Sequence, residues 1–257
     1  MNNIFSFKRF GYFFLYELNH IRSRFTHDML VLGILPLIMA TLSIAINLLQ
    51  GDELSPQSFD SSRGVLVAAL GLIPILFPAK MYGRVTDKRA GADWMLIPAS
   101  VPEKFISTLL VSTLVVPGVL ALMLSGCDLL LSAIFGEIYG PSAVISALKE
   151  TPAEVIMLIV CGFINTNLVF LLGAVCFRKA KVAKTFLTCF AITVLFSVIA
   201  VSFLDNGGDV FLGDFFLLED GLQLNGERIN LLLNIGIFGS MALLAGAIYY
   251  RLKTIKY

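Results

Sequence analysis

Residues 105–135 read FISTLLVSTLVVPGVLALMLSGCDLLLSAIF, an apolar run whose charged residue is Asp128. An α-helix needs about 20 apolar residues to cross roughly 30 Å of hydrocarbon at 1.5 Å per residue. The run exceeds that length, and Glu103 and Lys104 mark its N-terminal boundary. It therefore predicts a membrane-spanning helix rather than a strand or a helix of a soluble domain.

Five further runs of the same kind flank it. The predicted spans cover residues 29–49, 64–81, 155–177, 182–204 and 229–250. Because backbone groups find no water inside lipid, each span must be helical. The composition agrees, since 57% of the residues are apolar and 14% are charged, against about 25% charged in soluble proteins. We expect an all-α polytopic membrane protein with six transmembrane helices forming one domain over residues 29–257.

The basic residues predict the orientation. Of the nineteen Lys and Arg residues, sixteen fall on one side of the six spans. They are Lys8, Arg9, Arg22, Arg24, Lys80, Arg84, Lys88, Arg89, Lys104, Arg178, Lys179, Lys181, Lys184, Arg251, Lys253 and Lys256. The other side holds Arg63, Lys149 and Arg228. By the positive-inside rule, both termini are predicted to be cytoplasmic.

Residues 1–28 precede the first span and carry an amphipathic pattern. Large apolar residues recur at steps of three and four, at Phe7, Phe10, Phe14, Leu18, Ile21 and Phe25, which places them on one helix face. Tyr12 and Tyr16 suit the headgroup boundary. We interpret this segment as an in-plane helix at the membrane surface. The alternative is a helix packed on a soluble partner or on the chain's own bundle.

The connection between the second and third spans contains the segment DWMLIPASVPEKF, residues 93–105. Ser100 can cap a new helix, Pro102 suits its first turn, and Glu103 stands three residues after Ser100, as in a capping box. Lys104 is expected to extend toward the interface. Capping alone would account for most of these residues.

This segment, together with the in-plane helix and the six spans, resembles the permease subunits of ABC-2 type exporters. In that family the connection between the second and third spans holds a short coupling helix that docks on the ATPase. The resemblance implies that coupling role for Asp93, Trp94, Met95, Leu96, Ile97, Pro98, Ala99 and Ser100. It also implies location in a bacterial cytoplasmic (inner) membrane, contact with membrane lipid, and export by alternating access.

The sequence lacks the motif G-x-x-x-x-G-K-[ST], whose backbone cradles nucleotide phosphates. If the chain works in an ATP-driven transporter, the ATP-binding subunit must be a separate cytoplasmic protein. A second permease copy or a paralogue is the other expected partner, and nothing points to nucleic acid. Two hypotheses of other classes remain open: a membrane scaffold or sensor without transport, and an intramembrane enzyme.

Polar residues within the spans are candidates for a transport path. Asn165 and Asn167 lie midway along the fourth span and, two residues apart, point in different directions. Hydrogen bonding between helices is the favoured interpretation, at about 0.6 to 2 kcal/mol each, and lining of a path is the alternative. Asp128 lies near the end of the third span, where we expect a carboxylate that reaches water; a functional role is the alternative.

Proline and the outer connections add further expectations. Pro74 and Pro78, and the Pro117-Gly118 pair, should kink or interrupt the second and third spans, as hinges or as static bends. Residues 205–228 mix acids and glycines with short apolar runs. A short re-entrant helix and a hairpin at Asp220-Gly221 both fit this segment, and the resemblance favours the helix.

The sequence offers poor material for catalysis or metal binding. Its four cysteines, Cys127, Cys161, Cys176 and Cys189, show no C-x-x-C spacing, and its two histidines lie near the N-terminus. We therefore expect neither a metal site nor a cofactor. The chain contains no H-E-x-x-H or G-x-S-x-G motif either, so we expect no catalytic residues.

Overall fold

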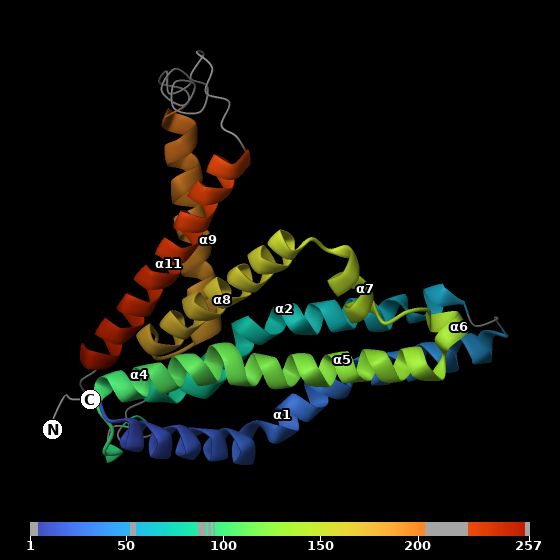
Figure 1. Cartoon of the computed structure of the whole chain (residues 1–257), viewed down its shortest axis with the longest axis horizontal. Helices are drawn as coiled ribbons and strands as arrows, with labels where there is room; N and C mark the ends of the chain where they lie inside the picture. Colours follow the sequence, from blue (N-terminus) through green and yellow to red (C-terminus); the bar gives the residue numbers. More distant parts are fainter. Residues whose placement is uncertain are drawn as a thin grey trace.

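The computed structural model describes residues 5–51, 55–86, 91, 94, 96–203 and 226–254, and the secondary structure in these ranges is helical (Figure 1). The longer helices are α1 (Phe7–Gln50), α2 (Asp60–Tyr82), α4 (Val101–Leu110), α5 (Val116–Ile134), α8 (Ala153–Cys176), α9 (Lys181–Phe203) and α11 (Gly226–Thr254). The shorter ones are η1 (Pro56–Phe59), η2 (Gly83–Thr86), η3 (Val111–Val115), α6 (Gly136–Tyr139) and α7 (Ala143–Glu150). The predicted all-α class is confirmed.

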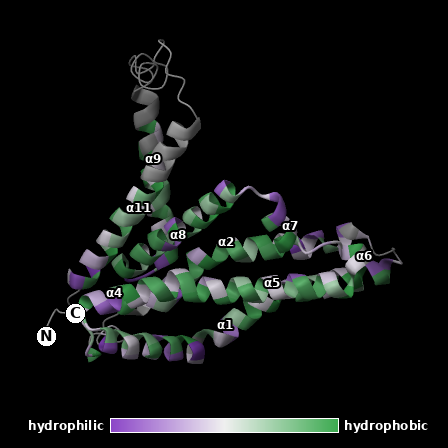
Figure 2. Cartoon of the chain, in the orientation of Figure 1, coloured by the Kyte–Doolittle hydropathy of each residue, from purple (hydrophilic) through white to green (hydrophobic). Residues whose placement is uncertain are grey.

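Four helical stretches of the described chain are long and apolar enough to cross a membrane. They are Phe25–Gln50, Gln57–Tyr82, Val101–Ile134 and Ala153–Cys176, and they coincide with the first four predicted spans. Figure 2 shows apolar residues along these helices and hydrophilic residues near the start of α4 and at α7. The chain is therefore a multi-pass membrane protein. The fifth and sixth predicted spans coincide with helices α9 and α11.

The predicted in-plane helix and the first span form one helix, α1, rather than two elements. The sequence from Tyr12 to Leu32 contains neither proline nor glycine, so nothing in it stops the helix. Figure 1 shows that α1 bends along its length. Apolar side chains of its N-terminal part, Phe14, Leu18 and Ile21, pack against the core of α2, η3 and α5. These contacts support the alternative stated above, in which the apolar face of residues 7–25 packs on the chain's own helices.

The third predicted span is a helix in three parts, α4, η3 and α5. η3 is a π-helix in which the Val116 N–H bonds to the Val111 carbonyl. Pro117 follows directly and has no N–H to give, so the hydrogen-bond register changes here. The helix is not broken at Pro117-Gly118, which lie inside α5; the effect of the proline is the π-helical register of the preceding residues Val111–Val115. α2 also stays helical through Pro74 and Pro78.

The helices form two groups joined by α8. In one group, α1 and α2 run alongside α4 and α5; in the other, α9 and α11 pack on α8, which also contacts α2 (Figure 1). The beginnings of α1 and α4 and the end of α11 lie at the same end of the molecule. At that end, Tyr82, Leu171, Ile248 and Leu252 belong to one buried cluster. We call this end of the molecule the basic end, because Arg9 and Lys104 lie in the first turns of α1 and α4, and Arg251 lies in the last turn of α11.

The segment 205–228, for which a re-entrant helix or a hairpin is predicted, lies outside the described residues up to position 225. From Gly226 onward it is the first turn of α11.

Candidate functional site

α4 buries a polar face, which is unusual for a helix within an apolar span. The buried polar residues recur at helical spacing, and each is at most 6% exposed: Ser100, Glu103, Lys104, Ser107, Thr108 and Ser112. Buried polar groups require hydrogen-bonding partners. For Glu103, Lys104 and Ser107 those partners come from α1 and from the segment that precedes α4, so this face gathers several elements at the basic end.

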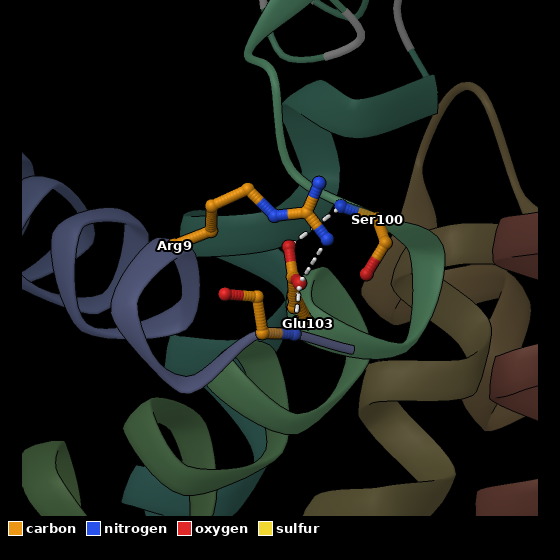
Figure 3. Close-up of polar contacts among 4 residues, drawn as sticks. Arg9, Ser100 and Glu103 are labelled. Atoms are coloured by element: carbon orange, nitrogen blue, oxygen red, sulfur yellow. Dashed lines mark hydrogen bonds and ion pairs between the residues drawn. The ribbon is translucent and has the colours of Figure 1, made fainter. Parts of the chain in front are cut away.

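Glu103 is the most connected residue of this face (Figure 3). Its Oε2 accepts the Ser100 N–H at 2.8 Å, and its Oε1 accepts the Ser6 N–H at 2.8 Å and Arg9 Nη2 at 3.0 Å. The capping box predicted between Ser100 and Glu103 is confirmed. The same carboxylate also fixes the start of α1 to the start of α4, which the sequence did not predict.

Glu17 forms a second link between α1 and α4. Its carboxylate accepts a hydrogen bond from the Ser107 hydroxyl. Glu17 as a whole is buried, with 7% of its surface exposed. Burial raises the pKa of Glu17 to about 7, against the opposing effects of Ser107, Trp94, Lys104 and Tyr82. A carboxyl group that titrates near neutral pH therefore lies between α1, α2, α4 and Trp94.

Trp94 holds the preceding segment onto this cluster. The Lys104 ammonium donates to the Trp94 carbonyl at 2.9 Å and lies 4.6 Å from the centre of the indole ring, a cation–π contact. Phe13 meets the same ring edge-on at 6.5 Å. Lys104 is 3% exposed, so the expectation that it extends to the interface is wrong: the indole and the Trp94 carbonyl bind its ammonium inside the protein.

The predicted coupling segment divides into anchored and exposed residues. Trp94 is half-buried, and Ala99 and Ser100 are buried. Between them Leu96 is 80% exposed, Pro98 is exposed and Ile97 is intermediate. The remaining two predicted residues, Asp93 and Met95, lie outside the described residues. The structure thus presents an exposed apolar side chain on a short segment that is fixed at both ends.

Asn165 and Asn167 bond to different helices, as their spacing predicts. Asn167 is fully buried, donates to the Ser112 carbonyl at 3.1 Å, and accepts from Thr113 at 3.3 Å. Asn165 accepts from Ser240 of α11 at 3.4 Å. The π-helical register would pair the Ser112 carbonyl with residue 117, which is proline. Asn167 therefore supplies the donor that the backbone lacks, and both asparagines serve interhelical hydrogen bonding.

Asp128 is fully buried, so the expectation of a carboxylate in contact with water is wrong. It accepts the Tyr139 hydroxyl at 2.5 Å, the Ser142 hydroxyl at 2.5 Å and the Val144 N–H at 3.1 Å. Burial, and then the adjacent Asp128, raise the pKa of Tyr139 to about 12. Arg63 stacks on the Tyr139 ring, 4.6 Å from its centre. The cluster fixes α6 and the start of α7 to α5, which is a structural role far from the basic end.

Comparison of the chain with protein-family models, with curated proteins and with solved structures finds no match. Interpretation of the site therefore rests on its geometry.

Within the described ranges, no group of three or more His, Cys, Asp or Glu side chains is arranged to hold a metal ion. The four cysteines are free thiols. At the basic end, the described contacts include hydrogen bonds, the Arg9–Glu103 ion pair and ring contacts of Trp94.

The sequence analysis did not predict the role of Glu17 or the buried polar face of α4. In both cases the spacing of residues in the sequence contains an indication. Glu17 stands four residues after Phe13 and one residue before Leu18, so it falls beside the apolar face of its helix. The polar residues of α4 recur at steps of three and four within an otherwise apolar span, a pattern that predicts a buried polar contact in a membrane helix.

Proposed function

We propose that the chain is the permease subunit of an ATP-driven exporter in a bacterial inner membrane, with six spans and both termini in the cytoplasm. The ATP-binding subunit is a separate cytoplasmic protein. A second copy or a paralogue of the chain completes the membrane part, and the substrate moves outward by alternating access.

One observation carries this proposal: Leu96 is exposed on a segment whose two ends are fixed to membrane helices. Displacement of Leu96 by a partner would act on α4 through the contact of Trp94 with Lys104. It would also act on α1, because Phe13 packs on Trp94 and Arg9 pairs with Glu103. A short exposed segment coupled to two membrane helices is what a soluble motor needs in order to move them.

The charge distribution supports docking at this end. Arg9, Lys181 and Arg251 all belong to elements that begin or end at the basic end. Electrostatic attraction to an acidic partner surface accelerates association and falls with ionic strength. The same charges orient the chain in the membrane, so they serve both purposes.

Copurification tests the proposal. We expect the chain, extracted from its native membrane in mild detergent, to bring with it a protein that binds ATP, and ATP hydrolysis to follow the complex through size-exclusion chromatography. A chain that elutes without any nucleotide-binding protein, under several detergents and after cross-linking in the membrane, would favour a scaffold or sensor instead.

A further inference from the structure

α7 is an amphipathic helix whose apolar face is exposed. No residue of α7 is buried, and its two large exposed apolar side chains are Ile145, 40% exposed, and Leu148, 59% exposed. Because they stand three residues apart, they lie side by side on one face of the helix. Ser146 and Glu150 fall on the opposite face, and Lys149 lies at the edge of the apolar face.

Both ends of α7 are fixed to helices that are long and apolar enough to cross the membrane. At its start, the Ser142 hydroxyl and the Val144 N–H donate to the buried Asp128 carboxylate of α5, at 2.5 and 3.1 Å. Asp128 stands six residues before Ile134, where α5 ends, which places it about 9 Å inside the end of that helix. At the other end of α7, residues 151–152 lead directly into α8.

These attachments fix the level of α7 relative to the membrane. The helices on either side belong to the spans Val101–Ile134 and Ala153–Cys176, so α7 lies on the side of the membrane opposite the basic end. Figure 1 shows α7 between α6 and the start of α8. Because its start is bound inside the end of α5 and its end is close to α8, α7 stays at the membrane surface. Apolar side chains exposed at this level are covered by lipid at lower free energy than by water.

We propose that α7 is an in-plane helix that binds the lipid surface opposite the basic end through Ile145 and Leu148. Lys149 and Glu150 give α7 no net charge, so apolar burial rather than headgroup charge drives the contact. The contact fixes the height at which α8 enters the membrane, and α8 joins the two groups of helices. This role requires the spans on either side of α7, and it holds whether or not the chain transports a substrate.

Tryptophan fluorescence of the full chain in phosphatidylcholine bilayers tests this contact. Trp94 is the single tryptophan of the chain, so a Trp94→Phe background makes each introduced tryptophan the reporter. We expect Leu148→Trp and Ile145→Trp to emit at shorter wavelength and to be quenched by lipid brominated on its acyl chains. Bromines near the headgroup should quench more than bromines near the chain end, because an in-plane helix lies about 5 to 10 Å into the headgroup and acyl boundary. Glu150→Trp, on the opposite face, is the matched control and should be quenched by acrylamide in the water.

The lipid headgroup and the protein-to-lipid ratio are then varied. Quenching of Leu148→Trp by brominated lipid should be the same when phosphatidylglycerol replaces phosphatidylcholine, and the same at every protein-to-lipid ratio. If Leu148→Trp does not fold, Ile145→Trp gives the same readout. Quenching of these reporters mainly by acrylamide would place α7 in water and overturn the proposal. Shielding from both quenchers, or lipid quenching that appears only when the protein is diluted, would show that protein covers this face, and would overturn it too.

Discussion

Arg9 and Glu103 form an ion pair at 3.0 Å in which the guanidinium side is 42% exposed and the carboxylate side is fully buried. The pair joins the first turn of α1 to the first turn of α4, residues that stand far apart in the sequence. Its asymmetry matters, because the buried carboxylate also accepts the N–H groups of Ser6 and Ser100. The partly exposed guanidinium of Arg9 is thus one of three donors to the buried Glu103 carboxylate, and the other two are backbone N–H groups.

Glu103→Ala should therefore destabilise the protein far more than Arg9→Ala. Removal of the carboxylate leaves the N–H groups of Ser6 and Ser100 without their acceptor, and we expect a loss of about 3 kcal/mol or more. Removal of the partly exposed guanidinium should cost about 1 kcal/mol or less. Thermal unfolding of the detergent-purified variants measures both. Equal losses would show that the ion pair itself, rather than the backbone donors, fixes the two helices.

Glu17 should make stability depend on pH. Its pKa is raised from 4.5 to about 7 in the folded protein, so folding favours the protonated form. The stabilisation is fully present below pH 4.5 and is lost as pH rises to about 7. By 1.36 kcal/mol per pKa unit, the full effect is about 3 kcal/mol.

Glu17→Gln keeps this position neutral at every pH, and it should remove that part of the pH dependence. We expect the variant to match the natural chain at pH 4 and to be more stable at pH 8, by thermal unfolding across this range. Glu154→Gln, at an exposed position of α8, is the matched control and should leave the profile unchanged. A Glu17→Gln profile with the natural slope contradicts the assignment.

Asn167 should be more important for stability than Asn165. Asn167→Leu removes the donor to the Ser112 carbonyl, and an unpaired buried carbonyl costs about 1 to 3 kcal/mol. Asn165→Leu loses one long bond from Ser240, whose hydroxyl also bonds to the Ile237 carbonyl, so the expected loss is about 0.6 kcal/mol. Chemical denaturation in detergent compares the two. Similar losses would mean that the π-helix does not depend on Asn167.

Of the two glycines of α8, Gly173 should tolerate substitution by alanine less well than Gly162. A Cβ at this position would lie 2.9 Å from the Thr185 Cβ of α9, whereas a Cβ at Gly162 meets nothing within 4 Å. Gly173→Ala should therefore loosen the packing of α8 on α9 by about 1 to 3 kcal/mol. Gly162→Ala should be neutral or stabilising by up to about 1 kcal/mol. The unfolding temperatures of the two variants are the measurement. An unchanged unfolding temperature for Gly173→Ala would contradict the close contact between Gly173 of α8 and Thr185 of α9.

The sequence predicts the helices well because their signals are local. Length and apolar composition predict the spans, Ser100 and Glu103 set the start of α4, and Pro117 marks the change of hydrogen-bond register in the third span. Burial of polar residues depends on long-range contacts instead. Asp128 was expected to reach water because it stands near a span end, but Tyr139 and Ser142 fold back over it. Lys104 was expected at the interface, and the Trp94 carbonyl and ring hold it inside.

Long-range contacts also explain why the predicted coupling segment divides into anchored and exposed residues. From the sequence alone, Trp94 and Leu96 are two large apolar residues of one short segment, and no pattern predicts which of them is buried. The structure separates them, because Phe13 approaches from α1 and Lys104 from α4, and both contact Trp94. Leu96 is 80% exposed. A contact between residues 13 and 94 has no local signature in the sequence, so only the folded chain distinguishes the anchored residue, Trp94, from the exposed one, Leu96.

Under the proposed function, Leu96→Ala should reduce association with an ATP-binding subunit without destabilising the chain. An exposed side chain contributes within about 0.5 kcal/mol to folding, whereas an apolar residue at the centre of an interface contributes about 2 kcal/mol or more to binding. Trp94→Ala should instead lower the unfolding temperature, because it removes the contacts with Phe13 and Lys104. Leu122→Ala, which truncates a 74% exposed leucine of α5, is the matched control. Copurification of the ATP-binding subunit and thermal unfolding, measured for all three variants, decide the matter: full association by Leu96→Ala would remove the coupling role from this segment.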